Sequence, residues 1–583
     1  MAGLEEAVLD NDEKVLTPST DSTSNHELVF ALVAPAETNL DWVSAELANQ
    51  LRKKNYEVLI IRLSQFLPAI TITNERGEQV SLRTEPRDAY LESFMNAGTE
   101  LRHMVDRALK KRVLDAKEPF DHEPGGALAY LAADFIATVR ERTDFDEIKG
   151  KSLQETLDHI AANPNARVPM EQRGVPRRAY ILRSLKHPQE VYVLRNIYDS
   201  GAYVIGVHSR RALRKKKLAD AIAAPFGHNE NTPDYEQHTA RAETLLLKDE
   251  DEPDKLGQRV RDTFHLSDLF IDLADESEEA LTPVGKEIER FVELVMGNCL
   301  QAPTVDEHLM FLAHAVALRS GSLGRQVGAA IGTPDGELIA TGSNDVPRAG
   351  GGQYWPNEHY DHRDLTEPED TSNVQRKKII QEIIEVIVGE EIAKGIDANL
   401  ILDKLDKKRF ASVIEFSRTV HAEMEAILSA ARRGTPIANT HLYTTTFPCH
   451  ECARLILGAG IARVIYIEPY PKSLADELFT HEITLDDDNE AKQCPKCGRP
   501  HKIRFAAFSG VGPHRYMELF GLATSEGRRR ERKSKEGKLI EGGHLKPIQP
   551  LSPLSYLEKE KRAGVEIRSF LGDRSGDTEN PES

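Results

Sequence analysis

Four residues in one stretch of the sequence have the types and spacing of a metal-dependent hydrolytic site. His421 and Glu423 form a His-x-Glu motif, and Pro448, Cys449 and Cys452 form a Pro-Cys-x-x-Cys motif. Two thiolates and one imidazole bind Zn²⁺ and leave a fourth coordination position for water. We therefore predict a zinc ion held by His421, Cys449 and Cys452. A carboxylate that does not bind the metal can move protons, which is the role we predict for Glu423.

Two predicted helices bring these residues together. Pro448 suits the first position of a helix, which would place Cys449 and Cys452 on one face of its first turn. The partial positive charge of a helix N-terminus stabilises thiolates and so favours metal binding. A second helix is predicted over 421–431, from which Glu423 can reach the open coordination position. Because purely structural zinc sites usually have four protein ligands, three ligands beside a carboxylate favour catalysis.

The elements that precede these motifs follow a recognisable order. Helical spacing is predicted over 288–296 and 306–319, and a tight turn joins two predicted strands over 327–331 and 338–342. Asn344 follows the second strand, and helix–strand units then carry the two motifs. This order resembles the cytidine deaminase fold, and the branch that it resembles most is that of the deoxycytidylate deaminases.

The resemblance implies a zinc-dependent hydrolase that converts dCMP, dCTP or both to the uracil nucleotide and ammonia. Glu423 would take a proton from the zinc-activated water that attacks C4 of cytosine, and would then deliver protons to N3 and to the leaving amine. Asn344 matches a residue that binds the sugar 3′-hydroxyl. Tyr470 matches an aromatic residue near the base, with core packing as the alternative. Four basic loop residues are candidates for the substrate phosphate: Arg325, Arg348, Arg363 and Lys472.

The first half of the chain is predicted to be a second α/β unit. Helical spacing over 40–53 lies among short apolar runs that are typical of buried strands, at 28–33, 58–63, 179–182 and 203–208. A strand, loop, helix and strand begin a P-loop domain. The basic run 210–217 resembles the phosphate-closing helix of nucleoside-monophosphate-kinase-like folds, with a solvated helix face as the alternative. The loop at 34–39 has neither glycine nor lysine, so we predict a degenerate phosphate loop.

Both halves together resemble the bacterial anti-phage deoxycytidylate/dCTP deaminases. The predicted fold class is α/β, with an N-terminal P-loop nucleoside-monophosphate-kinase-like domain and a C-terminal cytidine-deaminase-like α/β/α domain. The predicted boundaries are a disordered leader (1–25), the kinase-like domain (26–273), the deaminase domain (282–522) and a polar C-terminal tail (523–583). The resemblance implies depletion of deoxycytidine nucleotides in anti-phage defence, under the control of the first domain and of a regulatory nucleotide bound there.

Length and composition restrict the functional classes. A chain of 583 residues needs two or three domains. It contains no run of about 18 apolar residues, so we expect no membrane span, and its acidic start lacks the core of a signal peptide. The net charge of −19 argues against a stable complex with nucleic acid. The alternative function is a cytidine deaminase acting on RNA or single-stranded DNA, which would need a basic, aromatic-lined channel.

Cysteine usage indicates a reducing compartment, and we expect a cytoplasmic protein. Four of the five cysteines form two Cys-x-x-Cys pairs. The second pair, Cys494 and Cys497, could hold a second zinc ion only with further ligands, and a reduced structural pair is the alternative. Cys299 is expected to be buried. A charged helical insertion at 373–410 is interpreted as core packing or a subunit contact, and we expect a homo-oligomer.

Overall fold

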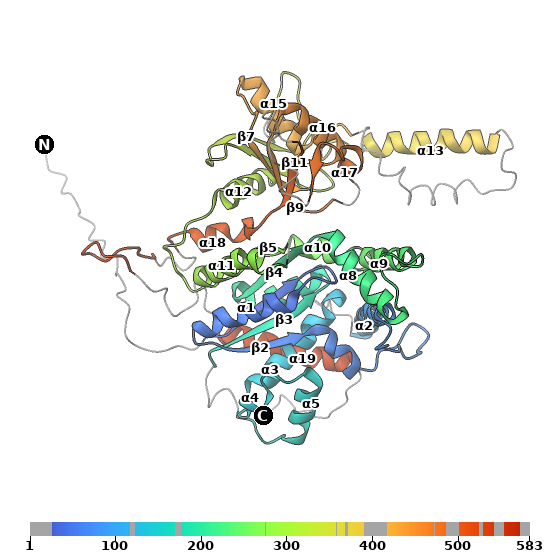
Figure 1. Ribbon diagram of the computed structural model, residues 1–583, viewed down its shortest axis with the longest axis vertical. Coiled ribbons are helices and arrows are strands. Elements are labelled where there is room, and N and C mark those ends of the chain that lie inside the picture. The colour runs from blue at the N-terminus through green and yellow to red at the C-terminus, as the bar shows by residue number, and fades with distance from the viewer. Residues whose placement is uncertain are drawn as a thin grey trace.

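The computed structural model describes residues 26–116, 123–168, 176–273, 276–356, 358, 360–367, 371–389, 417–470, 473–485, 501–523, 529–540 and 553–571. Over these residues the chain forms two α/β domains, each around its own sheet (Figure 1). The predicted leader, the candidates Lys472, Cys494 and Cys497, and the insertion after 389 lie outside the described residues. Among the described helices, none combines the length and apolarity needed to cross a membrane.

A six-stranded sheet forms the centre of the first domain, in the order β12-β5-β4-β1-β3-β2. Five strands are parallel: β1 (Leu28–Val33), β2 (Glu57–Arg62), β3 (Arg178–Leu185), β4 (Ala202–Ser209) and β5 (Leu269–Leu273). The sixth strand, β12 (Gly510–Val511), pairs antiparallel with β5. Every residue of β1 is buried, as expected for a parallel strand that helices cover on both faces. The strand predicted at 28–33 is confirmed.

Helices cover both faces of this sheet. One layer consists of α1 (Leu40–Lys53) and α11 (Glu278–Val295), whose apolar sides join the strand residues in one buried cluster. The opposite layer contains α2 (Arg87–Ala116), α3 (Ala127–Arg140) and α7 (Pro188–Tyr198). The helix predicted at 40–53 is confirmed as α1.

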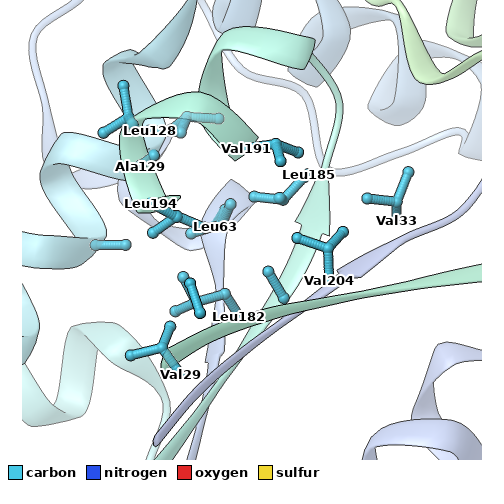
Figure 2. Packing of buried hydrophobic residues seen from close by; sticks show 14 of the residues in the cluster. Val29, Val33, Leu63, Leu128, Ala129, Leu182, Leu185, Val191, Leu194 and Val204 are labelled. Carbon is cyan, nitrogen blue, oxygen red and sulfur yellow. The ribbon is translucent and has the colours of Figure 1, made fainter. Parts of the chain in front are cut away.

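The opposite layer buries closely packed aliphatic side chains. Figure 2 shows Leu128 of α3 and Leu194 of α7 in one cluster with Val29 of β1 and Leu182 of β3. Each fully buried side chain of this size contributes about 1.5–3 kcal/mol to folding. This packing fixes the strands, and therefore the positions of the loops at their carboxyl ends.

The polar tail predicted at 523–583 contains a helix that completes the first domain. α19 (Pro553–Leu571) packs against α3 and α7. Its buried Glu560 accepts two hydrogen bonds from Arg140 of α3, one of them 2.8 Å long. Buried Tyr556 donates a hydrogen bond of 2.7 Å to Glu27. The sequence analysis misses this helix because Arg140, the partner of Glu560, lies 420 residues earlier in the chain.

The second domain has a six-stranded sheet in the order β10-β11-β9-β8-β6-β7. The predicted hairpin is confirmed as β6 (Gly328–Gly332) and β7 (Leu338–Ser343), and β6 also pairs antiparallel with β8 (His441–Thr446). The remaining strands run parallel to β8: β9 (Arg463–Glu468), β11 (Ile503–Ala507) and β10 (Ile483–Thr484). α12 (Val305–Ala317) covers one face, and α15 (Ala422–Arg433) and α16 (His450–Ala459) cover the other. The predicted α/β/α layers are present.

The described part of the predicted insertion is α13 (Thr371–Gly389), which extends away from the second sheet (Figure 1). Ile380 is buried, whereas Ile379, Ile383 and Ile384 are half-buried. These neighbouring apolar side chains agree with the predicted packing role. The subunit contact stays a prediction.

The packing places the domain boundary later than the predicted 282. α11 belongs to the first domain, because residues such as Phe291 pack under its sheet. After β11 the chain returns to the first domain, where β12 pairs with β5 and the ring of Phe508 meets that of Phe270 edge-on, with centroids 5.8 Å apart. Both rings and Ile467 of β9 belong to one apolar cluster that spans the two domains.

A buried carboxylate fixes the returning chain. Asp268, before β5, accepts hydrogen bonds from Arg195 (2.8 Å) and from His514 (2.6 Å) and Arg515 (3.1 Å), which follow β12. Burial alone would raise the pKa of Asp268, but Arg515, His514 and Arg195 hold that pKa well below its usual range. Removing one partner of such a buried pair is costly, so these contacts stabilise the junction.

A second carboxyl group at the junction has the opposite shift. Glu287 of α11 accepts a hydrogen bond of 2.7 Å from the hydroxyl of Ser509. Burial raises the pKa of Glu287, the hydrogen bond from Ser509 lowers it and the nearby Glu307 raises it, and together they bring this pKa to about 7. Glu287 therefore titrates near neutral pH.

Replacing this group tests the shift. The pKa of Glu287 is about 7 in the folded protein against an ordinary 4.5. The contribution of this group to the free energy of unfolding is therefore greatest at acid pH, where Glu287 is neutral, and is lost as the pH rises through 7. The glutamine of Glu287→Gln does not titrate. We expect the free energy of unfolding of this variant, relative to that of the wild type, to be about 2 kcal/mol higher at pH 8 than at pH 5. Urea unfolding followed by circular dichroism at both pH values measures this. The exposed Glu289→Gln is the control, and equal behaviour of the two variants would contradict the assignment.

Candidate active site

The two predicted metal-binding motifs lie at the N-termini of neighbouring helices, α15 and α16. His421 is the N-cap of α15 and Cys449 is the N-cap of α16, so each helix begins one residue after a predicted ligand. The predicted helix starts are corrected accordingly, because Pro448 precedes the cap. The Cys449 sulfur accepts a hydrogen bond of 3.5 Å from the backbone N–H of Cys452. A thiolate in this position pairs an otherwise free N–H group and faces the positive end of the helix.

The three predicted ligands converge on one point. Nδ1 of His421 lies 3.3 Å from Sγ of Cys449 and 3.4 Å from Sγ of Cys452, and all three ligand atoms lie within 4.8 Å of one another. A tetrahedral zinc ion, with Zn–S bonds of about 2.3 Å and a Zn–N bond of about 2.0 Å, holds sulfur and nitrogen about 3.5 Å apart. The side chains fit this ion, and they form the zinc site.

Hydrogen bonds and charges at this site favour the ligand form of Cys449, whereas those of Cys452 and His421 form only when zinc displaces their protons. The hydrogen bond from Cys452, followed by the contact with His421, lowers the pKa of Cys449 to about 4. The same contact with Cys449 raises the pKa of His421, and burial raises the pKa of the Cys452 thiol. Zinc binding requires two thiolates and a neutral imidazole, so it releases protons and becomes weaker as the pH falls.

Glu423 lies in the first turn of α15, directly beside the ligands. Its carboxylate is 4% exposed and accepts a hydrogen bond of 3.4 Å from the thiol of Cys452. Its other oxygen lies 3.4 Å from the hydroxyl of Thr444. Burial raises the pKa of Glu423, which His421 opposes and Cys449 reinforces. A carboxyl group with a raised pKa exchanges protons more readily near neutral pH. The sequence analysis did not identify Thr444, since a lone threonine in a strand carries no signal.

Two glycines allow the helices to approach the sheet closely. A Cβ atom on Gly342 of β7 would lie 2.2 Å from the carbonyl oxygen of Ala422 and 2.4 Å from the nitrogen of Ala426, both in α15. A Cβ atom on Gly328 of β6 would lie 2.0 Å from the carbonyl oxygen of Ala313 in α12. Any larger residue at 342 would push α15 outward and move the zinc ligand at its N-terminus. This position is a second one that the sequence analysis did not single out.

Three of the predicted substrate residues gather near the zinc ligands. Asn344 is buried, and its amide joins the carbonyl of Arg325 to the N–H of Val327 through two bonds of 2.7 Å. Arg325 forms an ion pair with Glu468 at the end of β9. Tyr470 is half-buried; burial and the nearby Cys449 raise its pKa, while Arg325 lowers it. The charges of Cys449 and Arg325 thus both act on Tyr470. Contact of these residues with substrate stays a prediction.

Arg348 and Arg363, the other phosphate candidates that the structure describes, are both paired with carboxylates. Arg348 pairs with Glu358 and lines a hollow of about 500 Å³ formed with Ala349, Gly350, Tyr354 and Tyr360. Arg363 is buried and held by Asp361 at 2.6 Å, so its charge is already paired. Cys299 was expected to be buried but is half-exposed, with its thiol 3.4 Å from the carbonyl of Glu531. Lys472, Cys494 and Cys497 lie outside the described residues.

Comparison with known proteins assigns this site to a family. The model of the cytidine and deoxycytidylate deaminase zinc-binding region matches residues 303–468. The deoxycytidylate deaminase of enterobacteria phage T2 is 31% identical over 162 residues, which are 28% of this chain and 79% of the phage protein. The chain belongs to the cytidine and deoxycytidylate deaminase family. Its second domain is therefore a zinc-dependent deaminase domain.

Two further similarities cover different shares of the chain. ComE operon protein 2 of Bacillus subtilis is 44% identical over 64 residues. These residues are 11% of this chain, which thus spans only 34% of the length of that relative. The apo dCMP deaminase of cyanophage S-TIM5 aligns over 36% of this chain and 100% of its own, at 16% identity and a TM-score of 0.19. The family match lies in the second domain, and the family of the first domain is not identified.

Substitution of a single ligand tests the zinc site. We expect Cys452→Ser to lower the bound zinc by one ion per chain, because the thiolate supplies one of three protein ligands. Elemental analysis of the purified full chain measures the loss. Cys299→Ser is the matched control and should keep its zinc. An unchanged zinc content in Cys452→Ser would contradict the assignment. If Cys452→Ser loses one zinc ion per chain and still contains another, the remaining ion would support the predicted second site at Cys494 and Cys497.

Proposed function

We propose that this protein hydrolyses free deoxycytidine nucleotides, dCMP, dCTP or both, to the uracil nucleotide and ammonia. The observation that carries the proposal is the buried Glu423 beside three zinc ligands, since such a site leaves a coordination position for water. The similarity to a phage deoxycytidylate deaminase over most of that protein's length supports dCMP as the substrate.

The side chains divide the chemistry between them. Bound zinc would supply a water molecule whose pKa is lowered toward about 7. Glu423 takes up the proton released there and then donates protons to N3 and to the leaving amine of cytosine. Its burial favours this, because it raises the pKa of the carboxyl group. Thr444 contacts the carboxylate on one oxygen and Cys452 on the other, so the group is held in one orientation.

The substrate contacts follow from the residues around the zinc ligands. We place Tyr470 next to the base and Asn344 next to the sugar 3′-hydroxyl. Arg325 would exchange its ion pair with Glu468 for the substrate phosphate. Arg348 and Lys472 are the further phosphate candidates. The buried amide of Asn344 spans the loop that carries Arg325, so the sugar and phosphate contacts are mechanically linked.

Free nucleotides are favoured over a polymer. The net charge of −19 opposes the approach of RNA or DNA, and single-stranded nucleic acid is bound through basic grooves with stacked aromatic residues. The alternative function remains a deaminase that acts on cytidine in RNA or single-stranded DNA. The two functions differ in which substrate releases ammonia.

A substrate panel tests the proposal. We expect the full chain to release ammonia from dCMP or dCTP and not from single-stranded DNA or RNA. Glu423→Gln should keep its zinc and lose at least about 100-fold in turnover, because proton transfer is removed while the ligands remain. Zinc content and ammonia release are measured on the same samples. A zinc-loaded Glu423→Gln that still turns over would exclude the assigned role, and activity on the polymer alone would favour the alternative.

The first domain is proposed to be a P-loop kinase-like module that regulates the deaminase. The parallel strand order β2-β3-β1-β4-β5 supports this, because β1, which leads into the loop at 34–39, lies where the strand order reverses, the usual ligand position in open parallel sheets. An enzyme that destroys deoxycytidine nucleotides endangers its own cell. We therefore propose restraint of the enzyme until infection, with anti-phage depletion of these nucleotides as its purpose and a homo-oligomer as its form.

Restraint can be tested by excising the deaminase domain. A fragment from residue 297 to residue 509 begins after α11 and ends before β12. Restraint predicts that this fragment, once it carries zinc, deaminates dCMP faster than the full chain. A zinc-loaded fragment that is no faster would reject restraint by the first domain and would leave the deaminase activity itself untouched.

A further inference from the structure

The carboxyl ends of β1, β3 and β4 meet at one edge of the first sheet. β1 lies between the other two strands and is the point at which the strand order reverses. Ligands of open parallel sheets bind at such a point. Three donor groups face it: the backbone of the loop at 34–39, the ammonium group of Lys186 after β3, and the guanidinium groups at the start of α8 (Arg211–Ala223) after β4. Backbone N–H groups with converging cations suit an anion.

A carboxylate of the chain itself already occupies the middle of this edge. Asp249, in the last turn of α9 (Tyr235–Glu250), accepts a hydrogen bond of 2.7 Å from the backbone N–H of Ala36. Its other oxygen accepts a hydrogen bond of 2.8 Å from Lys186, which also donates to the carbonyl of Ala34 at 2.9 Å. The Asp249 side chain is 1% exposed. One oxygen thus binds the loop after β1, and the other binds the cation after β3.

The next residue does the same for the third strand. Glu250 pairs with Arg211 and accepts a hydrogen bond of 3.0 Å from Arg214, so one carboxylate is shared by the two arginines after β4. Arg211 also pairs with Glu243 of α9 at 2.8 Å. The basic run predicted to close over phosphates is therefore paired internally at these two arginines. Two adjacent carboxylates thus connect the ends of all three strands.

The edge still contains donors that these carboxylates leave unused. Arg214 is 4% exposed and Ser209 is 1% exposed. Nη1 of Arg214 and Oγ of Ser209 have no hydrogen-bond partner within the described residues. Both belong to the end of β4 and the start of α8, and Nε of Arg214 donates to the carbonyl of Ser209 at 3.1 Å. Buried donors without partners are costly, and a larger, multi-oxygen anion would satisfy them better than two carboxylates do.

Apolar packing brings α9 to this position. Leu218 and Ile222 of α8 form a separate buried cluster with Leu245 and Leu246 of α9. This cluster aligns the two helices, so that the residues directly after Leu246 and Leu247 reach the carboxyl ends of the strands. The ion pairs are thus a consequence of the helix packing.

We propose that Asp249 and Glu250 take the place of a pyrophosphate-type anion and keep an anion site at the edge of the first sheet closed. The site combines the N–H of Ala36, Lys186, Arg211 and Arg214. A nucleotide polyphosphate binds there only by displacing both carboxylates. The intact first domain therefore has little affinity for such ligands, and neutralising the two carboxylates exposes the site.

Isothermal titration of the full, zinc-loaded chain with inorganic pyrophosphate tests this. We expect the wild type to bind no tighter than about 1 mM at this site, and Asp249→Asn/Glu250→Gln to bind at least about 10-fold tighter. Adding Lys186→Ala to the double variant should abolish the gain, which separates this site from the phosphate contacts of the deaminase. Glu236→Gln, which removes one carboxylate at the other end of α9, should behave as the wild type does.

The single variant Glu250→Gln keeps the test open if the double variant does not fold. It retains the Asp249–Lys186 pair, and pyrophosphate should raise its melting temperature more than that of the wild type or of Glu236→Gln. The proposal is overturned if the wild type binds pyrophosphate as tightly as the double variant and loses it with Lys186→Ala. It is also overturned if folded variants without these carboxylates gain no affinity.

Discussion

Three ligand atoms on two helices can share one zinc ion only if the two helix N-termini point at the same place. Here His421 caps α15 and Cys449 caps α16, and both helices lie on one face of the second sheet. The absence of a side chain at Gly342 lets α15 lie directly on β7. The hairpin, β8 and the helix packing all serve this convergence. Glu423 needs no separate positioning element, because it lies in the first turn of the same helix.

In the first domain too, apolar packing between helices positions polar side chains that lie outside the apolar cluster. The cluster between α8 and α9 brings Asp249 and Glu250 to the carboxyl ends of the strands, where their partners are cations and a backbone N–H. At the domain junction, Asp268 gathers Arg195, His514 and Arg515 in a similar way. Ile467, next to Glu468 at the end of β9, lies in the apolar cluster that contains Phe270 and Phe508. The active-site strand is thus in packing contact with the first domain.

Periodicity and motif spacing predict the local elements well. β1 and α1 have the predicted residues, and the ligands at 421, 449 and 452 follow from side-chain chemistry. The misses share one cause: their signal lies in a partner that is far away along the chain. Glu560 of α19 looks like a surface residue in the sequence, but it forms a buried ion pair with Arg140. The apolar side of α11 packs on a sheet whose strands come earlier in the chain. Asp249 and Thr444 are ordinary residues until the fold places a backbone N–H or a carboxylate beside them. Spacing cannot encode such pairs.

The route of the chain has a consequence for biosynthesis. The first domain begins at β1, is interrupted by the deaminase domain, and is completed only by β12 and α19. On the ribosome, the deaminase domain is therefore synthesised before the apolar and ionic surfaces around Arg140 and Phe270 can be covered. Domains generally fold as units in the order of their synthesis. Here the first domain is complete only after α19 has been synthesised. A nascent chain would thus have a folded deaminase domain before its first domain is complete.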